Sequence, residues 1–428
     1  MIDPLVIICL TIFVIAILLE VPMPFAMIGS TLIYSLANGQ SLIMYAQRTS
    51  ASFADYTLLA IPAFMFVGCF MNSIGLTELI FDFCGKMLGH IPGGLGHANI
   101  VASMVFAGMS GSALADAGGL GNIEVKAMKD AGYEPEFSVA VTAASSTIGP
   151  IIPPSINFVV YSFMTQTSSV AMFIGGLIPG ILMGISMMVL VYVEVKYFHI
   201  QAPITPKATG AERLKSFWRA LPALTAPVLL MIGILTGVMT TTETGVVAGV
   251  YCVILAIYYK RLNLKMFLQA MKDTLTTTVM TVFLIGTGAV FNWMLITGGV
   301  TAFLSKWLLS FNSTAMTLFV LNTVLIFLGC FMGSMSILIM VAPLLVEIAN
   351  ACGLSLVHLG VVAVLNMTLS LITPPMAPSL FTTCRISGVD FAGSVKRVMP
   401  FMIPLVVTLT LITYIPGLVT WLPSVFGF

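Results

Sequence analysis

The chain has 428 residues, of which 59% are hydrophobic and only 8% are charged, and its formal net charge is +1. Soluble domains carry about 25% charged residues, so this composition excludes a soluble globular protein and predicts a polytopic membrane protein. The sequence has no basic segments interleaved with aromatic residues, so it gives no indication that the chain binds nucleic acid. The seven cysteines have no paired spacing and the four histidines are scattered, which predicts neither a disulfide framework nor a zinc site.

Apolar windows that approach the length of a membrane span, about 20 residues, follow one another along the chain. They cover residues 4–21, 24–46, 56–73, 136–163, 171–195, 220–238, 244–259, 274–296, 355–384 and 399–422. Two further apolar stretches, 98–121 and 313–350, are interrupted at GMSGSA and FMGSMS. We expect each of these two to form a re-entrant hairpin. Asp3 stands where a signal peptide would carry basic residues, so the first window is expected to be an uncleaved span.

The positions of the basic residues predict the topology. With the two hairpins re-entrant, one set of loops lies on the same side and holds every Lys and Arg except Arg48 and Lys306. These loops are 85–97, 122–135, 196–219, 260–273 and 385–398. Basic loops face the cytoplasm. The chain is therefore expected to be a multi-pass membrane protein with both termini outside the cytoplasm.

The window 136–163 contains the segment TIGPIIPPS, with three prolines and a glycine at 147–155. Proline removes a backbone donor and breaks a helix, and lipid cannot satisfy the backbone groups that the break frees. The window 355–384 contains a similar segment, ITPPMAPS. We therefore predict that both windows are broken helices whose unwound backbone lines a protein cavity.

The chain contains an internal duplication at a constant shift of 224 residues. The shift relates Gly75 and Thr77 to Gly299 and Thr301, Ser110 and Ser112 to Ser334 and Ser336, and Pro150, Pro154 and Ser155 to Pro374, Pro378 and Ser379. The predicted organisation is a first repeat at 1–200, a basic cytoplasmic linker at 201–219 and a second repeat at 220–428. The short amphipathic segments 77–88 and 301–311 follow the same shift and are expected to be interfacial arms that hold the hairpins.

The predicted topology inverts the second repeat relative to the first. The predicted fold is an all-α polytopic membrane protein of two inverted-topology repeats, each with five spanning segments, one of them proline-broken, and one re-entrant hairpin. Inverted repeats with paired broken helices are the architecture of secondary transporters, whose substrate and ion sites lie where the unwound segments meet. We expect a unit of hairpins and broken helices to move against a scaffold formed by the first two spans of each half.

The hairpin tips and helix breaks supply the candidate ligands for sodium, a hard cation that needs several oxygen atoms. The predicted sodium ligands are Ser110, Gly111, Ser112 and Gly149 in the first repeat and Gly333, Ser334, Ser336 and Thr373 in the second. The predicted substrate contacts are Ser145, Ser146, Thr147, Ser155, Asn157 and Ser379. Asp116, in a hairpin arm, is a candidate for polar support of the site. Ser and Gly in membrane helices also serve simple close packing, which is the alternative for each of these residues.

Residues 106–156, FAGMSGSALADAGGLGNIEVKAMKDAGYEPEFSVAVTAASSTIGPIIPPSI, resemble the large membrane subunit of tripartite ATP-independent periplasmic (TRAP) transporters. The resemblance combines the hairpin tip, the GYEPEF loop and the proline-broken span, and it extends over essentially the whole chain. It implies sodium-coupled import of an organic acid by an elevator mechanism, with Na⁺ as the coupling ion at the two hairpin tips. It also implies two partners, a periplasmic substrate-binding protein and a separate small four-helix membrane subunit.

The substrate and several alternatives stay open at this level. A site rich in Ser and Thr without an intramembrane Arg favours sialic acid (N-acetylneuraminate), and a C4-dicarboxylate or a sugar acid is the other choice. Alternatives to the tripartite transporter are a standalone sodium symporter for divalent anions, a passive channel, and an intramembrane serine protease suggested by GMSG at 108–111. The protease hypothesis needs a general base near the serine and leaves the repeated serine motif at 334 unexplained. We therefore predict that the chain is not an enzyme.

Overall fold

The computed structural model of the chain describes residues 3–311 and 313–428, so the first two residues of the predicted first repeat lie outside it. All regular secondary structure within these ranges is helical. The first half of the chain contains α1 (Pro4–Leu18), α2 (Met23–Ala37), α3 (Leu42–Phe53), η1 (Tyr56–Leu59), α4 (Ala60–Ser73), α5 (Leu76–Leu88), α6 (Gly94–Ser110), α7 (Ala113–Gly118), α8 (Leu120–Asp130), α9 (Pro135–Ser146), α10 (Ile156–Thr165) and α11 (Ser169–Tyr197). The second half contains α12 (Gly210–Leu235), α13 (Thr241–Tyr258), α14 (Leu264–Thr297), α15 (Val300–Leu309), α16 (Thr314–Gly329), α17 (Ser334–Cys352), α18 (Leu356–Leu369), α19 (Pro378–Ser387), α20 (Phe391–Val398), η2 (Met399–Phe401), α21 (Met402–Tyr414) and α22 (Gly417–Val425).

Seven helical segments in the described residues are long and apolar enough to cross a membrane, which confirms the prediction of an all-helical polytopic protein. The single span predicted at 24–46 is wrong. Helix α2 ends at Ala37, and Gly39, in the left-handed region at φ +64°, turns the chain before α3 begins at Leu42. The predicted window has no charged residue near Gly39, so its average hydropathy gave no sign of this turn.

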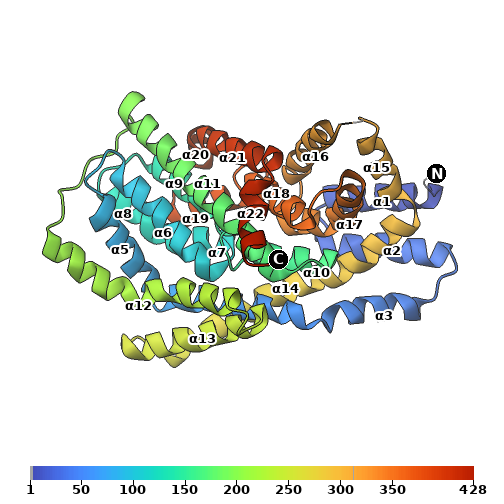
Figure 1. Cartoon of the computed structure of the whole chain (residues 1–428), viewed down its shortest axis with the longest axis horizontal. Coiled ribbons are helices and arrows are strands. Elements are labelled where there is room, and N and C mark those ends of the chain that lie inside the picture. The colour runs from blue at the N-terminus through green and yellow to red at the C-terminus, as the bar shows by residue number, and fades with distance from the viewer. Residues whose placement is uncertain (1–2, 312) are drawn as a thin grey trace.

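The long helix α14, of 34 residues, connects two groups of helices at opposite ends of the molecule. It packs against α2 and α3 at one end and against α4, which itself packs on α13, at the other. Figure 1 shows α12 and α13 at one end, α1 to α3 at the other, and α14 running between them. These helices form a framework, and the hairpin arms and interrupted helices lie along it.

Both predicted hairpins contain two arms joined by a short tip. In the first, α6 ends at Ser110 and the return arm consists of α7 and α8, which continues to Asp130. The predicted range 98–121 is therefore too short at both ends, because the apolar window omits the polar last turns of α8 and the glycine-rich first turn of α6. In the second, α16 and α17 are joined at 330–333, close to the predicted 313–350.

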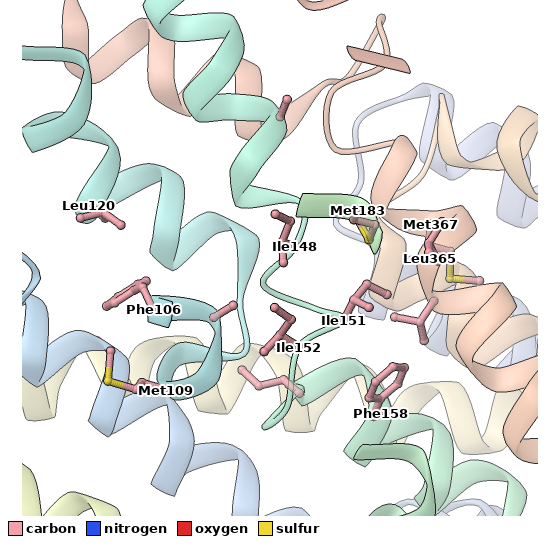
Figure 2. Packing of buried hydrophobic residues seen from close by; sticks show 14 of the residues in the cluster. Phe106, Met109, Leu120, Ile148, Ile151, Ile152, Phe158, Met183, Leu365 and Met367 are labelled. Atoms are coloured by element: carbon pink, nitrogen blue, oxygen red, sulfur yellow. The ribbon is translucent and has the colours of Figure 1, made fainter. Parts of the chain in front are cut away.

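Helix interruptions occur at both proline-rich segments, and their surroundings differ. Between α9 and α10, every residue from 147 to 155 is buried. Ile148, Ile151 and Ile152 point into the core, with Phe106 on one side and Leu365 on the other (Figure 2). Between α18 and α19, Pro375 and Met376 are exposed. Protein thus surrounds the first interruption, as non-helical backbone at membrane depth requires.

Four of the five Lys- and Arg-rich loops contact one another. Lys129 Nζ donates a hydrogen bond to the Ser387 carbonyl at 3.3 Å, and Arg397 forms a bidentate ion pair with Glu134 at 2.8 and 2.9 Å. The backbone N–H of Thr205 donates to the carbonyl of Gly89 at 3.1 Å. These contacts join loops 122–135 and 385–398, and loops 85–97 and 196–219, in pairs.

Candidate binding site at the hairpin tips

A cavity of about 250 Å³ lies where the two hairpin tips, both interrupted helices and the framework meet. Its lining consists of Met65 of α4, Gly111 to Leu114 at the first tip, Pro150, Ile156 and Asn157 around the first interruption, Thr277, Met280, Thr281 and Leu284 of α14, Ser334 and Met335 at the second tip, and Leu371 of the second interruption. None of these residues is Lys or Arg. Segments from both halves of the chain therefore build one site whose polar groups are hydroxyls, an amide and backbone atoms.

The first tip packs directly on the first interruption through two glycines. Gly111 has φ +59°, and a Cβ atom there would collide with the carbonyl oxygen of Pro154. A Cβ atom at Gly149 would lie 3.0 Å from the carbonyl carbon of Ser112. Only glycine permits backbones to approach this closely. The structure thus brings together Gly111, Ser112 and Gly149 as the sequence predicts.

The hydroxyl groups of the first tip have different surroundings. Ser110 is 1% exposed and its Oγ has no hydrogen-bond partner among the described residues. Its Cβ lies against Gly68 of α4, where an added Cβ would be only 2.9 Å away. Ser112 caps α7 by accepting from the N–H of Ala115 at 3.4 Å, and it also lines the cavity. Both serines retain oxygen lone pairs for a cation.

The unwound backbone of the first interruption adds further oxygens. The carbonyls of Thr147 and Gly149 accept no hydrogen bond from any described residue. Carbonyl and hydroxyl oxygens are the ligands that a hard cation prefers. The donor set around Ser110, Gly111, Ser112 and Gly149 therefore fits sodium, whereas the described residues contain no group of His, Cys, Asp and Glu suited to a transition metal.

The predicted second ion site is only partly assembled. Ser334 lines the cavity, and the N–H of Ser336 donates to the carbonyl of Gly333 at 3.0 Å. The hydroxyl of Thr373, however, donates to the Leu369 carbonyl at 2.6 Å and lies 3.4 Å from the sulfur of Met402. The residues that the second interruption presents are Ser370, which packs against Gly329 at the end of α16, and Leu371 in the cavity.

Most of the predicted substrate contacts lie away from the cavity. Ser145 bonds to Asn99 and Ser103 of α6, and the hydroxyls of Ser146 and Thr147 donate to carbonyls of α9. Ser155 caps α10, and Ser379 is buried outside the cavity lining with its hydroxyl unpaired among the described residues. Of the six, only Asn157 lines the cavity. Residues just before a helix end still follow the helical register, which here directs their side chains into α6 and back onto α9.

We expect Ser155→Ala to lower stability without changing transport kinetics, and Asn157→Ala to change transport kinetics without lowering stability. Loss of the Ser155 cap lowers stability by about 1 kcal/mol without changing the KM for substrate, because the Ser155 hydroxyl bonds only to the Pro150 carbonyl and the Phe158 N–H within the described part of the chain. Asn157→Ala raises KM with little change in the unfolding midpoint. Thermal unfolding and uptake kinetics of both variants check this, with Ser155→Thr as the control that retains the cap. A raised KM in Ser155→Ala would instead support the predicted contact between Ser155 and the substrate.

Sequence reasoning missed the contribution of α14. Thr277 and Thr281 face the cavity one turn apart, beside Met280 and Leu284. The signal was present as TLTTTVMT at 274–281, a cluster of threonines inside an apolar window. Helical spacing places residues 277 and 281 on one face, but their meeting with the hairpin tips depends on the packing of α14.

Asp116 lies behind the first tip and outside the cavity lining. It is 1% exposed, in α7, and neither carboxyl oxygen has a hydrogen-bond partner among the described residues. Asp116 is therefore not among the residues that line the cavity, so no direct contact supports its predicted role as polar support for the site.

Comparisons with known proteins agree over nearly the whole chain. Residues 8–418 match the family model of the tripartite ATP-independent periplasmic transporter, DctM component. The chain is 38% identical to the sialic acid TRAP transporter large permease protein SiaM of Vibrio cholerae, over 95% of each chain. It is 34% identical to the C4-dicarboxylate TRAP transporter large permease protein DctM of Pseudomonas aeruginosa, over 92% of each. The structure resembles the crystal structure of the YdaH transporter of Alcanivorax borkumensis, with a TM-score of 0.63, 14% identity and coverage of 88% and 89% of the two chains.

Proposed function

This chain belongs to the DctM component family of the tripartite ATP-independent periplasmic transporters, whose permeases import carboxylates, and we propose that it does so by sodium coupling and an elevator mechanism. Membership confirms the resemblance of residues 106–156 and makes the chain a transporter rather than an enzyme.

The observation that carries the proposal is the cavity shared by the two hairpin tips and α14. A cavity between a framework helix and a separate group of hairpins suits a substrate that moves with the hairpins. Displacement of that group along α14 would expose the cavity to each side in turn.

The order of elements supports two repeats of the same plan. A left-handed glycine, Gly75 or Gly299, precedes a short amphipathic helix in each half, namely α5 or α15. A hairpin and an interrupted helix follow in both halves. The contacts among the basic loops support the assignment of one cytoplasmic side, and with it both termini in the periplasm of a bacterial inner membrane.

Sodium coupling is supported by the oxygen-rich first tip described above. The second tip contributes Gly333, Ser334 and Ser336, and we retain Thr373 in the proposed second site through its backbone carbonyl rather than its hydroxyl. Closure of these tips around the ions would preorganise the cavity for the substrate, which couples ion binding to substrate binding.

We propose sialic acid as the substrate. The lining combines hydroxyls of Ser112, Thr277 and Ser334 with the amide of Asn157 and has no Lys or Arg. Such a lining suits a polyhydroxylated monocarboxylate, because a dicarboxylate would bring a second charge without a cation to pair it. The Vibrio cholerae relative is named for sialic acid and the Pseudomonas aeruginosa relative for C4-dicarboxylates, so the choice depends on the lining.

The proposed partners follow from the tripartite family. They are a periplasmic binding protein that delivers the substrate and a small four-helix membrane subunit. The framework helices α12 and α13 carry exposed apolar residues, including Val228, Ile232 and Val250, that lipid or the small subunit would cover.

Uptake into proteoliposomes that contain the chain with its small subunit tests the proposal. With a sialic-acid-binding protein outside and an inward sodium gradient, we expect sialic acid to accumulate. Neither a C4-dicarboxylate with its own binding protein nor sialic acid in potassium alone is expected to accumulate. Accumulation of the dicarboxylate would reject the substrate, uptake without sodium would reject the coupling, and uptake without any binding protein would favour a standalone symporter.

A further inference from the structure

A second hollow lies on the framework, between α13 and α14, and shares no lining residue with the binding cavity. Both helices pack on α4 but far less on each other, so α4 forms the floor of a groove of about 660 Å³. None of the described residues in its lining is charged, and its walls include Phe66, Val246, Val250, Val253, Met271 and Leu275. The volume falls in the range of ligand pockets, roughly 300–1,000 Å³.

The floor of the groove is narrow because two glycines of α13 lie against α4. A Cβ atom at Gly245 would be 2.8 Å from the Cβ of Ala63, and one at Gly249 would be 3.3 Å from the ring of Phe66. The rim is uncovered, since Leu275 is 57% exposed. An acyl chain carries no side chains and can reach this floor, whereas a helix about 10 Å wide would only cover the groove from outside.

A pocket of about 490 Å³ with basic residues lies beside the groove, where α4 ends and the turn between α13 and α14 crosses it. Lys260, Arg261 and the acidic Glu78 contribute to its lining. Arg261 Nη1 donates to the carbonyls of Ile74 and Gly75 at 2.9 and 2.7 Å, which holds the guanidinium group at the end of α4. No ion pair among the described residues includes Lys260 or Arg261. The pocket therefore keeps a net positive charge that suits an anionic ligand.

The pocket and the groove open on the same side of the framework. Phe66 in the groove and Ser73 in the pocket are two turns apart on one face of α4. Asn263 in the pocket, which caps α14, is one turn before Phe267 in the groove. At 1.5 Å per residue these spacings amount to about 6 to 10 Å along the helices. A phospholipid with its headgroup in the pocket would therefore direct an acyl chain into the groove.

We propose that the pocket and the groove together bind one anionic phospholipid, with its phosphate at Lys260 and Arg261 and an acyl chain between α13 and α14. Basic pockets between membrane helices on the cytoplasmic side bind anionic headgroups. The assignment to the cytoplasmic leaflet rests on the proposed topology, whereas the binding itself depends neither on the substrate nor on sodium. The lipid bridges α13 and α14, which pack little on each other, and so stiffens the framework against which the hairpins move.

Native mass spectrometry of the delipidated chain, alone and in complex with its small subunit, tests the site. The probes are phosphatidylglycerol, phosphatidylcholine with the same acyl chains, and glycerol 3-phosphate as a phosphate without chains. We expect one phosphatidylglycerol to bind in both preparations, about tenfold more tightly than phosphatidylcholine, and glycerol 3-phosphate not to bind. Equal binding of the two lipids overturns the proposal, as does binding of glycerol 3-phosphate with the affinity of the lipid.

Lys260→Gln tests the headgroup and is expected to weaken phosphatidylglycerol binding about fivefold, the effect of one basic residue near an anionic surface. Lys260 is changed rather than Arg261 because Arg261 also holds the end of α4. Lys215→Gln is the matched control, since Lys215 of α12 is exposed and lies outside the pocket lining. An equal change in both variants would mean that the charge of the surface, and not the pocket, attracts the lipid, and this overturns the proposal.

Val250→Trp tests the groove and is expected to abolish retention of the lipid, because the indole fills the space of the acyl chain. Val228→Trp is the matched control, since Val228 of α12 is 54% exposed, as against 56% for Val250, and does not line the groove. Leu275→Trp, from the opposite wall, serves if Val250→Trp fails to fold. Unchanged binding in the groove variant overturns the proposal. Loss of the lipid in the complex with the small subunit also overturns it, because the groove would then be a protein interface.

Discussion

Gly111→Ala is expected to abolish uptake. The Cβ atom would occupy the space of the Pro154 carbonyl oxygen, and residue 111 has φ +59°. A side chain in the left-handed region costs about 1–2 kcal/mol, and overpacking against backbone adds about 1–3 kcal/mol. The first tip would have to lift from the interruption, which separates the oxygens of the proposed first sodium site. Uptake in proteoliposomes and the unfolding midpoint in sodium measure both consequences.

Gly353→Ala is the matched control for this change. Gly353 also has a positive φ, +65°, but a Cβ atom there meets nothing within 4 Å. It lies at the end of α17, away from the cavity lining. This variant should bear only the backbone strain and retain uptake. Equal loss in both variants would mean that strain, and not the contact between tip and interruption, limits transport.

The double variant Ser110→Ala with Ser334→Ala is expected to lose sodium-coupled uptake while the protein still expresses and folds. Each substitution removes one hydroxyl at one tip, and the Ser110 hydroxyl has no other partner among the described residues. Sodium that binds only the folded state stabilises it by about 2.7 kcal/mol at a hundredfold excess over its Kd. The unfolding midpoint of the wild type should therefore be higher in sodium than in potassium at equal ionic strength, and the variant should show no difference.

Ser35→Ala provides the control for removing a buried hydroxyl. Ser35 of α2 is also fully buried with an unpaired Oγ in the described part of the chain, and it does not line the cavity. Its variant should keep the full sodium effect. If the double variant keeps that effect as well, the hydroxyls of the tips do not bind the ion.

Local patterns in the sequence were sufficient to predict the membrane class, the hairpin tips and the helix interruptions. Hydrophobicity and the conformational limits of proline and glycine act within a few residues, so PIIPP and MSGS indicate interruptions wherever they are packed. The family could be recognised for the same reason, since its motif at 106–156 is contiguous. Hydropathy gave no such signal for the turn at Gly39, so the prediction of a single span at 24–46 was wrong.

The partners of each side chain were decided only by the tertiary structure. Ser145, Ser146 and Thr147 immediately precede the interruption, yet the register of α9 directs them into α6 and their own helix, while Asn157 enters the cavity. Thr277 of α14 lies far from either tip in sequence and reaches the cavity because α14 packs across the framework. Hydropathy and helix-breaking residues act locally, whereas the direction of a hydroxyl depends on helix rotation and on neighbours hundreds of residues away.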